Sequence, residues 1–262
     1  MSILKKAKKK KPIKVKRIKR TVKQVGSLVD KGELEDILLL AQRYTTVKNY
    51  VFSRFSGIKS LPILDNYRKE IRDVWVKTGF ANQFKLLSRY WKLALDESIS
   101  NIKSLWSNCK NKMKEAIRNN DHLSEDEKSY LYYILAADKL FNSIVNREKI
   151  TRPKKIEKLI IREKYIHHLL CRYARRYRGK TPYSNVSRSF SIDPPMYTYV
   201  QEKEKAFIEF ASLKKMKRIR IKLEDRNQYH QNIRVIFDGD KLHFHHCVQS
   251  KCKQLWKEIN EV

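Results

Sequence analysis

Apolar residues recur every three to four positions through the first two-thirds of the chain, which predicts a succession of helices. The longest periodic segment covers residues 82–119, where ten apolar positions run from Phe84 to Ile117 with a mean step of about 3.67 residues, close to the helical period. A continuous helix over this segment would be about 57 Å long at about 1.5 Å per residue. Such a helix overruns a compact small domain and predicts an elongated lobe.

Other helices are predicted on both sides of this segment from apolar spacing and from the residues that start and stop helices. The sequence Ser-x-x-Glu at Ser124 and Glu127 is typical of a capping box that opens a helix. Pro153 marks a break before another helical segment. The predicted helices are residues 32–56, a shorter helix that ends at Gly79, residues 124–147 and residues 154–177.

After Gly179 the pattern changes from helical spacing to alternation. Residues 181–195 are rich in Pro, Ser and Asn and predict a loop. Residues 218–223 alternate strictly between basic and apolar side chains, which predicts a strand with one basic face. The remaining predicted elements are a strand at residues 207–210, a hairpin of residues 233–237 and 242–246 around Asp238-Gly239-Asp240, and a short helix within residues 251–262.

The N-terminal segment, residues 13–20, mixes β-branched and basic residues without strict alternation. It is consistent either with a short edge strand or with a disordered basic arm. The pattern as a whole predicts an α+β fold, with an elongated helical bundle lobe inserted in, or followed by, a small antiparallel β-barrel or sheet. We expect three parts: a basic N-terminal segment (residues 1–25) as a possible first barrel strand, a helical lobe (residues 26–180) and an antiparallel β region with a short C-terminal helix (residues 181–262).

The charge of the chain indicates what kind of partner it has. Among 262 residues there are 59 Lys and Arg but 28 Asp and Glu, a formal net charge of +31. Self-repulsion on this scale is relieved by a polyanion, so nucleic acid or an anionic membrane is the expected partner. The longest apolar run, residues 130–137, is far shorter than the roughly 20 residues of a membrane span. We therefore favour nucleic acid and expect no membrane partner.

The basic start of the chain is not followed by an apolar signal core, and the four cysteines have no framework spacing. Both features predict reduced thiols and a cytoplasmic protein, associated with the nucleoid if it binds DNA.

Three basic clusters are candidate nucleic-acid contacts. Residues 147–180 contain thirteen Lys or Arg against three acids, and arginine forks suit phosphate while tyrosine rings can stack on bases. For the cluster at residues 172–180, the alternative interpretation is a solvated helix end favoured by the helix dipole. For the cluster at residues 214–222, it is an exposed sheet face made soluble by its charge. The candidates are Lys14, Lys16, Arg17, Lys19 and Arg20; Arg172, Tyr173, Arg175, Arg176, Tyr177, Arg178 and Lys180; and Lys214, Lys215, Lys217, Arg218, Arg220 and Lys222.

Metal-binding and catalytic signatures are weak in this sequence. His243, His245, His246, Cys247 and Cys252 crowd near the C-terminus, but zinc sites usually need two close ligand pairs, so ordinary sheet roles are favoured. A turn explains Asp238 and Asp240 better than a Mg²⁺ site does. His167 and His168 are expected to be packing residues. We expect no cofactor and no catalytic residues, and hence a binding protein rather than an enzyme.

One segment carries a family resemblance. Residues 80–97, FANQFKLLSRYWKLALDE, resemble the N-terminal helical part of TnpB-like proteins, the transposon-encoded relatives of type V CRISPR effectors. In order, residues 13–20, 33–178 and 205–246 are similar to the first strand, the helical recognition lobe and the returning strands of the wedge β-barrel of that family. The resemblance implies a protein that binds structured guide RNA and DNA.

That family continues into an RNase-H-like nuclease domain, and the present sequence stops at Val262, about where that domain begins. The resemblance therefore carries no catalytic residue over and implies a recognition lobe without a nuclease. Two alternatives stay open. The chain is the recognition part of an endonuclease completed in trans by a separate nuclease subunit, or it is a non-guided basic RNA- or DNA-binding protein.

Overall fold

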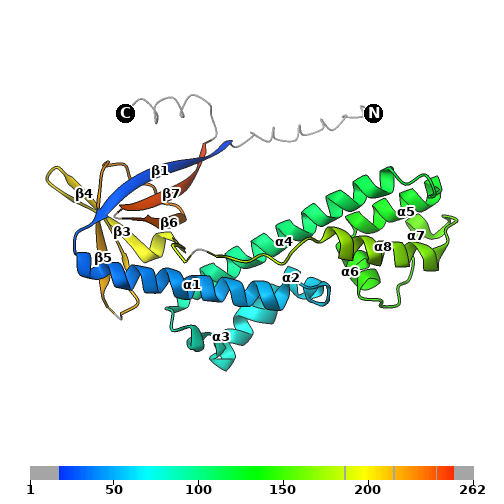
Figure 1. The fold of residues 1–262 in the computed structure, drawn as a ribbon, viewed down its shortest axis with the longest axis horizontal. Coiled ribbons are helices and arrows are strands. Elements are labelled where there is room, and N and C mark those ends of the chain that lie inside the picture. The colour runs from blue at the N-terminus through cyan, green and yellow to red at the C-terminus, as the bar shows by residue number, and fades with distance from the viewer. Residues whose placement is uncertain (1–17, 186, 215, 240, 251–262) are drawn as a thin grey trace, which may run out of the picture.

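The protein has an α+β fold, seen in a computed structural model that describes residues 18–185, 187–214, 216–239 and 241–250 (Figure 1). The described helices are α1 (Leu34–Phe55), α2 (Leu61–Asp65), α3 (Val74–Thr78), α4 (Ser88–Arg118), α5 (Glu125–Ala136), α6 (Asp138–Val145), α7 (Lys154–Glu157) and α8 (Glu163–Tyr177). The strands are β1 (Ile18–Leu28), β2 (Ser189–Ile192), β3 (Tyr197–Glu202), β4 (Lys205–Ala211), β5 (Arg218–Leu223), β6 (Ile233–Asp238) and β7 (Lys241–Ser250).

The seven strands of the described residues form one antiparallel sheet in the order β2-β6-β7-β1-β5-β4-β3. The first strand lies in the middle of this sheet, because β1 pairs with β7 along most of its length and with β5 near its end. The helical lobe is therefore inserted between the central strand and the remaining strands. Of the possible N-terminal strand at residues 13–20, residues 18–20 lie in β1, and residues 13–17 lie outside the described residues. Its placement at an edge is wrong, and the strand continues to Leu28, past residue 25.

The sheet is strongly curled, and aromatic side chains fill its concave side. Phe190 on β2 and Phe210 on β4 lie far apart in the strand order, yet their ring centroids are 5.7 Å apart. Tyr90, at the start of α4, packs edge-on against Phe190 and donates a hydrogen bond of 2.5 Å to the carbonyl of Ala211. The first turn of α4 thus closes the core of the sheet.

Helix α4 connects the two ends of the molecule. It is one continuous helix of 31 residues, about 46 Å long at about 1.5 Å per residue, and it runs from the sheet to the group formed by α5–α8 (Figure 1). The predicted elongated lobe is thereby confirmed. The helix begins at Ser88 rather than near residue 82, because Lys85 adopts a left-handed conformation with φ 50° after a short 3₁₀ turn.

The segments 124–147 and 154–177, each predicted as a single helix, are both broken in two. In the segment 154–177, side chains from α5 compete for the backbone N–H groups. The capping box at Ser124 and Glu127 is present as predicted. The carboxylates of Asp126 and Glu127 then accept hydrogen bonds from the backbone N–H groups of Ile160 and Arg162. These acceptors replace helical carbonyls, so α7 and α8 are separate.

The predicted helix 124–147 is broken at Ala137, which has extended dihedrals between α5 and α6. The turn brings Phe141 against Trp106 of α4, with their ring centroids 6.4 Å apart. Tertiary packing therefore decides the break, since no Gly or Pro marks it.

The β region follows the sequence pattern, but two of its strands, β2 and β3, were not predicted. The alternation of residues 218–223 and the hairpin around Gly239, which has φ +60°, are both observed. The expected loop of residues 181–195 contains β2, which alternates inward Phe190 and Ile192 with half-buried serines. The predicted C-terminal helix lies outside the described residues. No helix in the described part of the chain is long and apolar enough to cross a membrane.

Candidate nucleic-acid interface

Helix α6 ends in a turn that places an arginine where glycine is usual. The N–H of Arg147 donates to the carbonyl of Ile144 (3.0 Å), and the N–H of Glu148 donates to the carbonyl of Ser143 (2.9 Å). These two bonds define a Schellman motif, whose penultimate position is left-handed and is most often glycine. Arg147 occupies that position with φ 62°. A side chain is therefore kept there at a backbone cost of about 1 kcal/mol or more.

The Arg147 side chain lines a hollow between the end of α6 and one face of α8. The hollow has a volume of about 650 Å³. Helix α8 contributes residues spaced three or four apart, which lie on one face of a helix. The residues lining the hollow are Ile144, Arg147, Glu148, Lys164, His167, His168, Cys171, Arg172 and Arg175. We call this hollow the α6–α8 groove.

The groove is strongly cationic. Its four basic side chains are exposed, and none of them forms an ion pair with a carboxylate in the described part of the chain. Glu148 is the single acid in the lining. Net positive charge that is not neutralised within the protein is available to an anionic ligand.

The floor of the groove is fixed and partly shielded from water. His167 lies 2.7 Å, Nε2 to Oη, from the hydroxyl of Tyr130, and burial lowers the pKa of its imidazole. Burial also raises the pKa of the Cys171 thiol, while the positive charges of Arg175 and Arg147 oppose that shift. Both groups are therefore neutral at pH 7 and add no negative charge to the groove.

The predicted cluster at the end of α8 divides into residues that reach the groove and residues that do not. Arg172 and Arg175 line it. The guanidinium of Arg176 lies over the ring of Tyr177, 5.6 Å from its centroid. Arg178 is half-buried and Lys180 is exposed, and neither lines the groove.

The assignment of Tyr173 as a stacking residue is wrong. Its side chain is only 9% exposed, and its hydroxyl accepts a hydrogen bond from Asn120. The helix turns this ring into the core between α4 and α8, so no base can reach its face.

Several cations of the second cluster, at residues 214–222, are largely neutralised within the protein. Lys214 pairs with Asp36 (3.4 Å), and Lys217 lies 3.8 Å from both Glu33 and Asp36. Arg220 pairs with Glu202 (2.5 Å) and Glu209 (3.5 Å), and its guanidinium covers the ring of Phe207. Acids from α1 and the turn just before it, and from β3 and β4, thus reduce the positive charge that the sequence displays.

Arg218 and Lys222 are exposed on the outer face of β5 without a carboxylate partner in the described residues. Of the N-terminal candidates, Arg20 is exposed on β1. The other candidates, Lys14, Lys16, Arg17 and Lys215, and the side chain of Lys19, lie outside what the structure describes.

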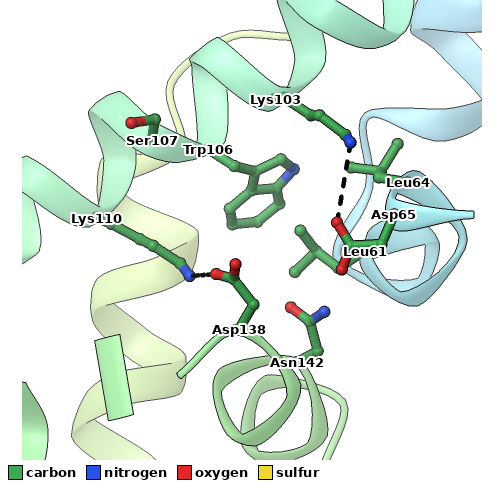
Figure 2. A pocket seen from close by; sticks show the side chains of 9 residues that line it. All are labelled: Leu61, Leu64, Asp65, Lys103, Trp106, Ser107, Lys110, Asp138 and Asn142. Carbon is green, nitrogen blue, oxygen red and sulfur yellow. Dashed lines mark hydrogen bonds and ion pairs between the residues drawn. The ribbon is translucent and has the colours of Figure 1, made fainter. Parts of the chain in front are cut away.

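A second hollow, of about 370 Å³ between α2, α4 and α6, also contains lysines, but each faces an aspartate (Figure 2). Lys103 lies 3.9 Å from Asp65, and Lys110 pairs closely with Asp138. Charges in this hollow cancel, so an anion gains little there. The contrast singles out the α6–α8 groove.

The histidines behave differently from one another. His168 is exposed and lines the groove, so its predicted packing role is wrong, whereas His167 packs against Tyr130 as expected. His246 is fully buried on β7 against Tyr229. Among the described residues, no group of three His, Cys, Asp or Glu side chains is arranged to hold a metal ion.

Arg147 and Lys164 are groove residues that the sequence analysis missed. An arginine at the end of a helix, with no glycine or proline to stop that helix, was an available signal for Arg147. Nothing in the local pattern around Lys164 distinguishes it from the other lysines.

Comparison with known proteins adds no relative: no family model matches this chain, and no curated protein matches it. The TnpB-like resemblance therefore stays a prediction.

Proposed function

We propose that the protein binds nucleic acid, and that the α6–α8 groove holds the phosphate backbone. The observation that carries this proposal is the convergence of Arg147, Arg172 and Arg175 on one hollow without a carboxylate partner among the described residues. Arginine is suited to this role because its planar guanidinium donates two parallel hydrogen bonds to phosphate oxygens.

Contacts of this kind position a backbone and carry no sequence information. We propose that sequence is read elsewhere, by base pairing between a structured guide RNA and DNA, as the TnpB-like resemblance implies. Two features support that finer proposal: the order of first strand, helical lobe and returning strands, and the continuous helix that extends the lobe away from the sheet. The proposed role is binding, in the cytoplasm or at the nucleoid, with no catalytic residue in this chain.

A salt titration tests the phosphate role. Fluorescence anisotropy with a labelled 20-nucleotide single strand would be recorded for the wild-type protein and for an Arg172→Ala/Arg175→Ala variant. The matched control is a Lys103→Ala/Lys128→Ala variant, which also removes two positive charges, but from side chains that pair with Asp65 and Glu125. Each lost phosphate contact lowers the slope of log K against log salt by about 0.7 for single strands. We expect a slope reduced by about 1.4 for the groove variant and a smaller change for the control.

Two outcomes would reject the proposal. One is an affinity that does not change with salt, and the other is a control variant that loses as much slope as the groove variant. The RNA that copurifies with the protein tests the guide hypothesis separately. One discrete structured species supports it, whereas ribosomal RNA or bulk DNA supports a non-guided binder.

A further inference from the structure

The α6–α8 groove continues past Lys164 into a neighbouring hollow with a different lining. This neighbouring hollow has a volume of about 750 Å³ and shares Glu148, Lys164 and His167 with the groove. Its other lining residues include Tyr165 in the first turn of α8 and Arg162, the residue just before that helix. A ligand in one hollow can therefore extend into the other without leaving the surface.

Tyr165 contributes a partly exposed aromatic ring to the end of the groove beyond Lys164. Its side chain is 42% exposed, unlike the buried Tyr173. The guanidinium of Arg162 lies over the ring, 4.7 Å from its centroid. Arg162 is itself fixed by hydrogen bonds to both carboxylate oxygens of Glu127 and to the carbonyl of His122. The ring therefore has a rigid support on one side and an accessible surface besides.

The two ends of the groove offer the two kinds of contact that an unpaired nucleotide strand makes. Phosphates are attracted to the cationic end at Arg147, Arg172 and Arg175, and a base can stack at Tyr165. Tyr165 and Arg172 are seven positions apart on α8, about 10 Å along the helix axis, which a few nucleotides of one strand can span. Paired bases in a duplex are already stacked on their neighbours, so they present no free face to the ring.

From this arrangement we propose that the joined groove binds single-stranded nucleic acid in preference to duplex, with one unpaired base stacked on Tyr165. The proposal rests on the proposed phosphate-binding function of the groove. Its chemistry is shared by RNA and DNA, since every base has an aromatic face.

The test uses the full chain and compares Tyr165→Ala with Tyr165→Phe, which keeps the ring, and with Tyr183→Ala. Tyr183 is 72% exposed and lines neither hollow. Each protein is titrated with a labelled 20-nucleotide RNA, the DNA of the same sequence, the corresponding duplexes, and strands in which the bases are replaced by abasic sites. Thermal melting confirms that each variant is folded.

We expect Tyr165→Ala to bind both single strands about 5- to 150-fold more weakly, the range for one stacked base. Tyr165→Phe and Tyr183→Ala should bind as the wild type does. The abasic strand should bind the wild type and Tyr165→Ala equally, because only the phosphate contacts remain. Wild-type preference for RNA or for DNA would show which strand the groove takes.

Unchanged binding by Tyr165→Ala, or an equal loss for duplex and abasic strands, would overturn the stacking proposal. The Arg172→Ala/Arg175→Ala variant separates this failure from a failure of the proposed function. If that variant binds all nucleic acids less tightly while Tyr165→Ala does not, only the stacking proposal is wrong. If neither variant changes binding, the groove is not the interface.

Discussion

Arg162 donates two hydrogen bonds to the carboxylate of Glu127, from Nε and from one terminal nitrogen, each 2.8 Å long. Glu127 is 2% exposed and also completes the capping box with Ser124 at the start of α5. One carboxylate thus joins the start of α5 to the start of α8 and fixes the arginine that supports Tyr165. The geometry of the groove depends on this pair.

The first prediction concerns acid stability. Hydrogen bonds from Arg162 lower the pKa of Glu127 from 4.5 to about 2, although burial opposes the shift. A lowered carboxyl pKa contributes stability that is present above the unfolded value and is lost as the pH falls toward the folded value. We expect Glu127→Gln to reduce stability at pH 7 by about 1.5–3 kcal/mol, as for hydrogen bonds to charged groups.

The difference in melting temperature between wild type and Glu127→Gln should narrow as the pH falls from 4.5 to about 2. Glu125→Gln is the control, because that carboxylate is 88% exposed and pairs only with Lys128 among the described residues. A gap that stays constant with pH would show that the charge of Glu127 is not what stabilises the wild type.

The second prediction separates binding from folding at Arg147. Glycine adopts the left-handed conformation of this residue without strain. We expect Arg147→Gly to weaken nucleic-acid binding while leaving stability unchanged or raising it by up to about 1 kcal/mol. Arg147→Ala should lose the same affinity without the gain in stability, because alanine keeps the backbone strain. Anisotropy and thermal melting measure the two effects, and wild-type affinity in both variants would exclude Arg147 from the interface.

The third prediction concerns Glu148, the acid in the groove lining. Its charge repels a phosphate backbone, so Glu148→Gln should tighten binding about 2- to 5-fold, the scale of an exposed charge pair. The gain should shrink in high salt, because exposed charges are screened. Glu157→Gln, on the exposed side of α7 and outside the groove lining, is the matched control. Equal gains in both variants would mean that only net charge matters.

The fourth prediction tests the curl of the sheet at Gly26. A Cβ at this position would lie 2.8 Å from the carbonyl oxygen of Lys222 and 2.6 Å from a methyl carbon of Ile221. The neighbouring backbone cannot move away without disturbing the β1–β5 pairing, so we expect Gly26→Ala to cost about 1–3 kcal/mol. Gly57→Ala is the control, since a Cβ at Gly57 would meet no described atom within 4 Å. Chemical denaturation of both variants checks the difference. Equal free energies of unfolding for Gly26→Ala and Gly57→Ala would show that the sheet can accommodate a Cβ at Gly26.

The positions of the long helix, the capping box, the alternating strand and the Asp-Gly hairpin were all predictable, because each depends on local periodicity or on a short motif. The breaks at Ala137 and between α7 and α8 were not. They depend on Trp106 and on the carboxylates of Asp126 and Glu127, which approach from other helices. The central place of β1 was hidden for the same reason, since its partners come from the far end of the chain.

By itself, the sequence determined that this protein carries a large excess of positive charge on an α+β scaffold, because composition and periodicity are properties of the chain. Only the tertiary structure decided which of those charges are free. Folding brings Glu33, Asp36, Glu202 and Glu209 onto Lys214, Lys217 and Arg220 of the 214–222 cluster, while it gathers Arg147, Lys164, Arg172 and Arg175 around one hollow. Electrostatic interactions depend on distance in space rather than in sequence, so neutralisation and convergence appear only once the chain is folded.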